Sequence, residues 1–108
     1  MNYSSLGLRE SDWVQITHII TSFPEVTSLK VFGSRAKGTF RNGSDIDIAL
    51  IGDAITPKII KKISFQLNEE TTIPFFVDIV DYTHLDKLEL KNHIDQFGLE
   101  DYSFTEKV

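Results

Sequence analysis

Residues 33–51 read GSRAKGTFRNGSDIDIALI and join a glycine-rich, basic loop to a short apolar run that opens with two acids. The run from Ile46 to Ile51 is typical of a buried β-strand, and Gly52 ends it. Because alternate residues of a strand share a face, Asp45 and Asp47 are predicted to point the same way, while the isoleucines beside them enter the core. Two carboxylates on one face repel each other, and a divalent cation would offset that cost.

A further acid lies in a second apolar run, Phe75 to Val80, which reads FFVDIV and follows Pro74. An unpaired carboxylate such as Asp78 is normally avoided in the middle of an apolar strand. If this strand lies beside the acidic one, three carboxylates converge and suit Mg²⁺ or Mn²⁺. Asp81 competes for the third position, but strand alternation places it on the opposite face from Asp78.

The loop between Gly33 and Ser44 is predicted to bind phosphate. Its glycines permit close approach of the backbone to an anion, and a short helix beginning here would direct its N-terminus at the phosphates. Arg35 is expected to act as a cationic clamp. We therefore predict nucleotide-binding roles for four loop residues: Gly33, Ser34, Arg35 and Ser44.

Several alternatives remain open from the residues alone. The loop is also consistent with an ordinary hairpin connection that turns at Asn42-Gly43. In that case Asp45 and Asp47 would lie on a strand edge that faces solvent. Lys37 and Arg41 could assist phosphate binding or could be solvated. The histidines show no metal-ligand spacing and are assigned no role: His18, His84 and His93.

The flanking sequence predicts helices and strands that pack on one another. Helical spacing of apolar residues predicts helices over about 9–23, 56–70 and 83–97. Thr56 is the predicted N-cap of the second helix, and Thr83 is the predicted N-cap of the third. Residues 29–32 form a further strand. The order helix, strand, strand, helix, strand, helix predicts an α+β fold, a two-layer α/β sandwich with a mixed sheet of three to four strands and helices packed on it. The expectation is a single domain over residues 1–108.

Composition narrows the class of protein. With 108 residues and 41% hydrophobic content, the chain can bury one core. The absence of cysteine excludes disulfides and a thiolate zinc site. A net charge of −5 argues against a nucleic-acid polymer as ligand. No apolar run is long enough for a membrane span, so we expect a cytoplasmic protein with no membrane partner.

The ordered set of motifs resembles a known family. Gly33-Ser34, ten spacer residues, Asp45-x-Asp47 and a later strand acid at Asp78 resemble the signature of the DNA polymerase β-like nucleotidyltransferase superfamily. The strings GSRAKG and SDIDIAL resemble its minimal, single-domain branch, which comprises antitoxin-like proteins that pair with a small helical HEPN-domain protein, often a ribonuclease toxin. Residues 90–104, LKNHIDQFGLEDYSF, are similar to that branch's usual ending.

The resemblance implies a reaction and a set of roles. Gly33 and Ser34 would hold the triphosphate of a nucleotide, ATP by expectation, and Asp45, Asp47 and Asp78 would act as catalytic ligands of two Mg²⁺ ions, with Mn²⁺ as a substitute. A hydroxyl of the acceptor would attack the α-phosphorus as pyrophosphate leaves, with Asp78 nearest the attacking oxygen. The resemblance implies that the acceptor is a tyrosine of the HEPN partner.

Two further points stay open at this stage. The alternative to an enzyme is a non-catalytic antitoxin that occludes its partner sterically and keeps a vestigial nucleotide site. The short chain suggests that another protein brings the acceptor. Alternatively, a second copy of this chain in a homo-oligomer could supply the surface that binds the acceptor.

Overall fold

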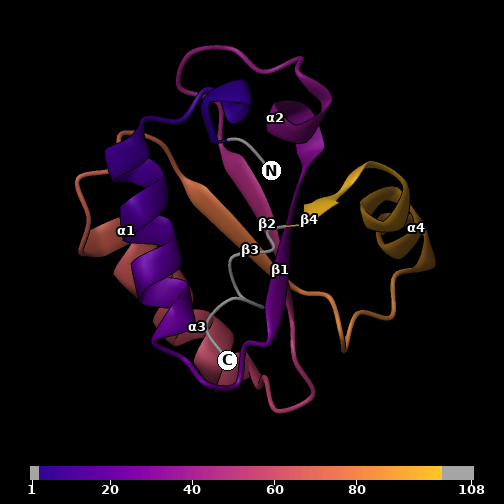
Figure 1. The fold of residues 1–108 in the computed structure, drawn as a ribbon. Helices are drawn as coiled ribbons and strands as arrows, with labels where there is room; N and C mark the ends of the chain where they lie inside the picture. Colours follow the sequence, from indigo (N-terminus) through magenta and orange to yellow (C-terminus); the bar gives the residue numbers. More distant parts are fainter. Residues whose placement is uncertain (1–2, 101–108) are drawn as a thin grey trace.

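A mixed four-stranded sheet, in the order β3-β2-β1-β4, forms the frame of the molecule (Figure 1). The structure is a computed structural model that describes residues 3–100, so residues 101–104 of the family-like ending lie outside it. In chain order the helices and strands are η1 (Tyr3–Leu6), α1 (Glu10–Thr21), β1 (Ser28–Phe32), α2 (Gly33–Lys37), β2 (Ile46–Ile51), α3 (Pro57–Glu69), β3 (Val77–Asp81), α4 (Leu88–Phe97) and β4 (Leu99–Glu100). The predicted α+β class is confirmed.

The register of the sheet aligns the strand acids. Strand β2 pairs antiparallel with β1 and parallel with β3. Across the parallel pair, Asp47 lies directly opposite Asp78, and across the antiparallel pair it lies opposite Phe32. The predicted adjacency of the two acidic strands is therefore confirmed, and α3 provides the crossover that parallel neighbours require.

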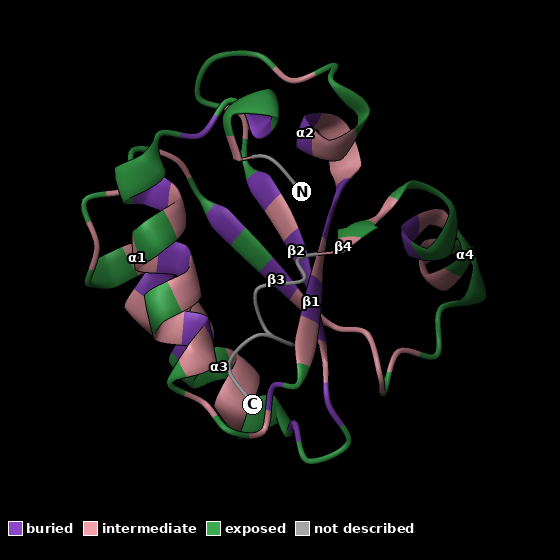
Figure 2. Cartoon of the chain, viewed as in Figure 1, coloured by how far each residue is buried: buried purple, intermediate pink, exposed green. Residues whose placement is uncertain are grey.

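Helices cover the two faces of the sheet unequally. Helices α1 and α3 lie together on one face, and α4 lies on the other (Figure 1). The face beneath α1 and α3 holds the main core, whose fully buried strand residues are Leu29, Val31, Ile46, Ile48, Leu50 and Val77 (Figure 2). A smaller cluster of Phe32, Ala49 and Ile94 joins α4 to the opposite face. Asp47 and Asp78 belong to that second face, because strand residues alternate.

The start of α3 agrees with the sequence and the start of α4 does not. The Thr56 hydroxyl accepts a hydrogen bond from the Ile59 N–H at 3.2 Å, as a cap should. Helix α4 begins at Leu88, so its predicted start at Thr83 is wrong. The Thr83 hydroxyl instead accepts the Gly52 N–H at 2.8 Å and holds the end of β2.

Within residues 3–100, no helix has both the length and the apolar character needed to cross a membrane.

Candidate functional site

Three aspartates meet at one end of the sheet, on the face that α4 covers only in part. Asp47 and Asp78 are register partners on adjacent parallel strands. Asp45 precedes Asp47 by two residues, so extended backbone directs both side chains to the same face. Asp45 and Asp78 are exposed, whereas Asp47 between them is half-buried. The structure thus brings together the three acids that the sequence singles out.

The electrostatics of Asp47 reflect this crowding. Partial burial raises the pKa of the Asp47 carboxyl above its ordinary value, and repulsion from Asp78 and Asp45 raises it further. A nearby imidazole, that of His93, acts in the opposite direction. Carboxylates that repel one another at an accessible sheet end suit a hard divalent cation, whose charge would relieve the repulsion. Within residues 3–100, no group of three or more His, Cys, Asp or Glu side chains is arranged so that it could hold a metal ion. The fit of a cation therefore rests on the register pair of Asp47 and Asp78 and on the repulsion among the three acids.

Gly33 lies in direct contact with this acidic cluster. Its φ of +75° belongs to the left-handed region that favours glycine. A Cβ built at this position would stand 2.2 Å from the Asp47 Oδ2 atom. Ser34 follows in the first turn of α2 and is half-buried. The backbone at Gly33-Ser34 therefore borders the space in front of the carboxylates.

Arg35 points into the protein, where its guanidinium interacts electrostatically with the carboxylates of Asp12 and Asp45. Its side chain is only 3% exposed, and Nε and Nη2 both donate to the Ser44 carbonyl, at 3.1 and 2.6 Å. Nη1 donates to the Leu6 carbonyl at 2.8 Å. The guanidinium also lies over the rings of Phe40 and Phe75, at 5.1 and 4.4 Å from their centroids. These contacts indicate a residue that positions the loop, and they give no support to the expected phosphate clamp.

Ser44 has a comparable local role. Its hydroxyl accepts the Arg41 N–H at 2.9 Å and closes the turn before Asp45. Together with the Arg35 hydrogen bonds to its carbonyl, this holds the segment that delivers Asp45 to β2. The sequence had grouped Ser44 with the nucleotide-binding residues; its bonds in the structure are to the loop itself.

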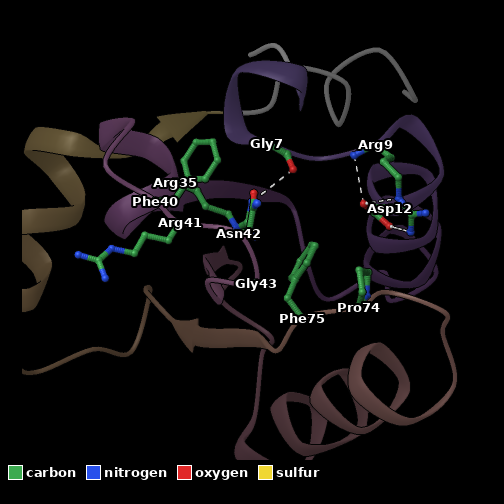
Figure 3. A pocket seen from close by; sticks show the side chains of 10 residues that line it. All are labelled: Gly7, Arg9, Asp12, Arg35, Phe40, Arg41, Asn42, Gly43, Pro74 and Phe75. Atoms are coloured by element: carbon green, nitrogen blue, oxygen red, sulfur yellow. Dashed lines mark hydrogen bonds and ion pairs between the residues drawn. The ribbon is translucent and has the colours of Figure 1, made fainter.

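A pocket of about 230 Å³ is lined in part by residues of this loop (Figure 3). Arg9 and Asp12 form an ion pair at its rim, with Arg9 Nη2 and Asp12 Oδ1 separated by 2.8 Å. The Arg41 side chain points away from it in Figure 3. The complete lining is Gly7, Arg9, Asp12, Arg35, Phe40, Arg41, Asn42, Gly43, Pro74 and Phe75. None of the three aspartates belongs to this lining, so pocket and acidic site are separate features.

His93 is the residue at this site that sequence reasoning missed. Its ring packs edge-on against Phe32, with 6.3 Å between centroids, and tilts against Phe97 at 5.1 Å. The only signal in the sequence is its place next to Ile94, in the helix turn that faces the sheet.

Asp81, the alternative candidate for the third acid, lies away from this site. Its carboxylate pairs with His84 Nδ1 at 2.8 Å, and it stands opposite Leu50 in the register, on the other face from Asp78.

Comparisons with known proteins give a consistent picture of the fold. A toxin–antitoxin crystal structure with AMP-PNP is 23% identical, with 86% of this chain and 72% of that chain covered and a TM-score of 0.67. Two mutants of the toxin–antitoxin MntA-HpeT are 20% and 23% identical, with TM-scores of 0.64 and 0.66. The two alignments cover 86% and 87% of this chain, and 71% and 72% of the respective solved chains. At these identities the likeness is one of fold.

Sequence comparison is more specific. No curated protein sequence matches the chain significantly. The family model for polymerase beta, nucleotidyltransferase, matches residues 14–99, which span α1 to β4 and include all three aspartates and Gly33-Ser34. The chain belongs to the polymerase beta nucleotidyltransferase family.

Proposed function

We propose that this protein is a metal-dependent nucleotidyltransferase that moves AMP from ATP onto a hydroxyl of a partner protein and thereby acts as an antitoxin. The observation that carries the proposal is the register pair of Asp47 and Asp78 beside Gly33, with Asp45 on the same face. The proposed partner is a HEPN-domain toxin, and the proposed acceptor is one of its tyrosines. The toxin–antitoxin nature of the structural neighbours supports a toxin as the partner, and the choice of a HEPN domain rests on the resemblance of the sequence motifs.

Each site residue has a task in this proposal. Gly33 and Ser34 bind the triphosphate, because backbone without a Cβ allows an anion to approach closely. Asp45, Asp47 and Asp78 hold two Mg²⁺ ions. Such ions, when bound, supply charge neutralisation for the leaving pyrophosphate and activation of the attacking hydroxyl. Arg35 supports the site indirectly, since it holds the carbonyl of Ser44, immediately before Asp45.

The exposure of Asp78 favours an acceptor carried by another protein. Strand β3 is an edge of the sheet, and Asp78 is exposed on it. Asp78 is therefore accessible to a side chain of a docked partner. In this proposal Asp78 would be the metal ligand nearest the attacking hydroxyl, and Asp45 and Asp47 would hold the metal ions that bind the nucleotide.

The test is transfer to the protein encoded next to this chain's gene. The purified chain, Mg-ATP and that neighbour are mixed, and the intact neighbour is weighed by mass spectrometry. A gain of one AMP per site, lost in Asp47→Asn and retained in Asp53→Asn, supports the proposal. Asp53 is exposed in the turn after β2, at the opposite end of the strand, and is the matched control.

Two outcomes would count against the proposal, one against catalysis and the other against the assignment of the site. If the neighbour binds tightly and gains no mass, the chain is an antitoxin that acts by occlusion. If Asp47→Asn transfers AMP as fast as the unaltered chain, the site has been misassigned.

A further inference from the structure

Helix α4 places one polar side chain in the row that faces the sheet. The neighbours of His93 in this row are apolar: Leu90 and Ile94 join the small core cluster, and Phe97 contacts the His93 ring. The His93 side chain is half-buried. Its two ring contacts hold the imidazole in place, and within residues 3–100 neither ring nitrogen takes part in a hydrogen bond. A fixed, partly desolvated donor therefore remains available to a ligand.

The position of His93 brings its imidazole close to the acidic site, near enough for an electrostatic interaction with Asp47. Its ring lies against Phe32, and Phe32 is both the register partner of Asp47 and the residue immediately before Gly33. Helices α2 and α4 are in contact, so the imidazole stands beside the turn that borders the carboxylates. Arg35, the loop base that the sequence predicts as the phosphate clamp, is committed to backbone carbonyls. His93 is thus placed on the α4 side of the space where a triphosphate would lie.

We propose that His93 is a nucleotide-binding residue whose imidazole N–H donates a hydrogen bond to an oxygen of the triphosphate. This inference rests on the proposed function, because it places the polyphosphate in front of Gly33 and Asp47. A donor at this position adds a charge-assisted hydrogen bond to a site whose own side chains are mostly acidic. The contact concerns the polyphosphate and leaves the base and ribose to other parts of the site.

The experiment measures binding, so it does not depend on an acceptor. Dissociation constants for Mg-tripolyphosphate, Mg-ATP and adenosine are obtained by calorimetry for the unaltered chain and three variants. His93→Phe keeps the aromatic packing on Phe32 and Phe97 but removes the donor. His93→Gln restores an N–H donor, and His18→Gln alters an exposed histidine on α1, on the opposite face of the sheet.

We expect His93→Phe to weaken Mg-tripolyphosphate and Mg-ATP on the order of tenfold, the usual effect of losing a hydrogen bond to a charged group. Adenosine affinity and thermal stability should be unchanged, His93→Gln should recover part of the loss, and His18→Gln should match the unaltered chain. Equal tripolyphosphate affinity in His93→Phe and the unaltered chain overturns the role of His93 alone. If the unaltered chain binds neither Mg-ATP nor Mg-tripolyphosphate, the nucleotide site fails, and the role of His93 with it.

Discussion

Gly33 sits where a side chain would displace Asp47, one of the three proposed metal ligands. The Cβ of an alanine there would meet the Asp47 carboxylate, 2.2 Å from Oδ2. A carboxylate can rotate aside, so Gly33→Ala should move Asp47 and abolish Mg-ATP binding while the fold persists. The positive φ adds a strain of roughly 1–2 kcal/mol. Calorimetric titration with Mg-ATP and urea unfolding measure the two effects.

Gly38 provides the matched control. Its φ of +77° is nearly the same as that of Gly33, but a Cβ there would have nothing within 4 Å. Gly38→Ala should therefore lose a similar roughly 1–2 kcal/mol of stability through backbone strain and keep its affinity for Mg-ATP. Equal nucleotide binding by both variants would show that contact with Asp47 does not matter.

The raised pKa of Asp47 predicts how stability depends on pH without metal. The folded protein holds this proton more tightly than the unfolded chain, whose carboxyl keeps a value near 3.8. As pH rises from there through the raised pKa, the folded state loses stability, because ionised Asp47 is partly buried beside two other acids. Asp47→Asn removes that penalty. Relative to the unaltered chain in EDTA, it should gain up to about 1 kcal/mol as pH rises, since solvent screens part of the repulsion.

Urea unfolding between pH 4 and pH 8, with EDTA present, measures this difference. Asp53→Asn, in an exposed turn, should run parallel to the unaltered chain across the range. A stability difference between Asp47→Asn and the unaltered chain that shrinks with rising pH would contradict the assignment of Asp47 as a repelled carboxylate.

At the level of secondary structure, Asn68 ties α3 to the start of β3. Its Nδ2 donates to the Val77 carbonyl at 2.9 Å, and its Oδ1 accepts the Val77 N–H at 2.8 Å. Val77 precedes Asp78, so these bonds hold the strand that presents the third acid. Asn68→Ala should destabilise the fold by about 1–2 kcal/mol and also weaken Mg-ATP binding, because Asp78 loses its support.

Thr56→Ala separates these two effects. It removes the N-cap of the same helix, at about 1 kcal/mol, but leaves the Val77 contacts intact. Thermal unfolding and Mg-ATP titration of both variants should therefore show similar losses of stability and a loss of affinity in Asn68→Ala alone. A comparable fall in affinity for Thr56→Ala would mean that general loosening of α3, and not the Asn68 bonds, governs the site.

The predictability of each element follows from how local its causes are. The boundaries of β2 and the cap of α3 depend on neighbouring residues, and the sequence predicts both correctly. Thr83 has the pattern of a cap, but its hydroxyl serves a distant N–H, that of Gly52, and α4 starts later. The two-residue strand β4 exists only because β1 lies beside it. No local sequence pattern predicts a hydrogen bond or a strand pairing with a residue so far away along the chain.

The same reasoning applies to the candidate site. Spacing alone identifies the acids and Gly33, because strand alternation and a close backbone approach are local properties. The sequence predicts Arg35 as a phosphate clamp, which its contacts do not support, and it assigns His93 no role. Arg35 points to the carbonyl of Leu6 and His93 packs on Phe32, and both partners are far away in the sequence. Roles that depend on tertiary neighbours require the structure.

Considered as a whole, the molecule separates stability from function between the two faces of its sheet. The face under α1 and α3 carries most of the buried apolar side chains, and the other face carries the repelling carboxylates beside the smaller cluster under α4. The main core among the described residues is built from apolar side chains packed on one another, so the chain should fold without metal. Ligand binding then adds to a fold that already exists.

Mg-ATP should consequently raise the melting temperature of the complete chain by an amount set by its affinity. At a concentration one hundred times the dissociation constant, the added stability is about 2.7 kcal/mol. For a domain of this size that corresponds to roughly 10–20 °C. ATP in EDTA should produce a much smaller shift, because the uncompensated carboxylates and the triphosphate repel each other. Asp47→Asn should lose most of the shift and Asp53→Asn should retain it. Thermal unfolding of the three proteins, with and without EDTA, measures this, and equal stabilisation by ATP in EDTA would show that the nucleotide binds without the acids.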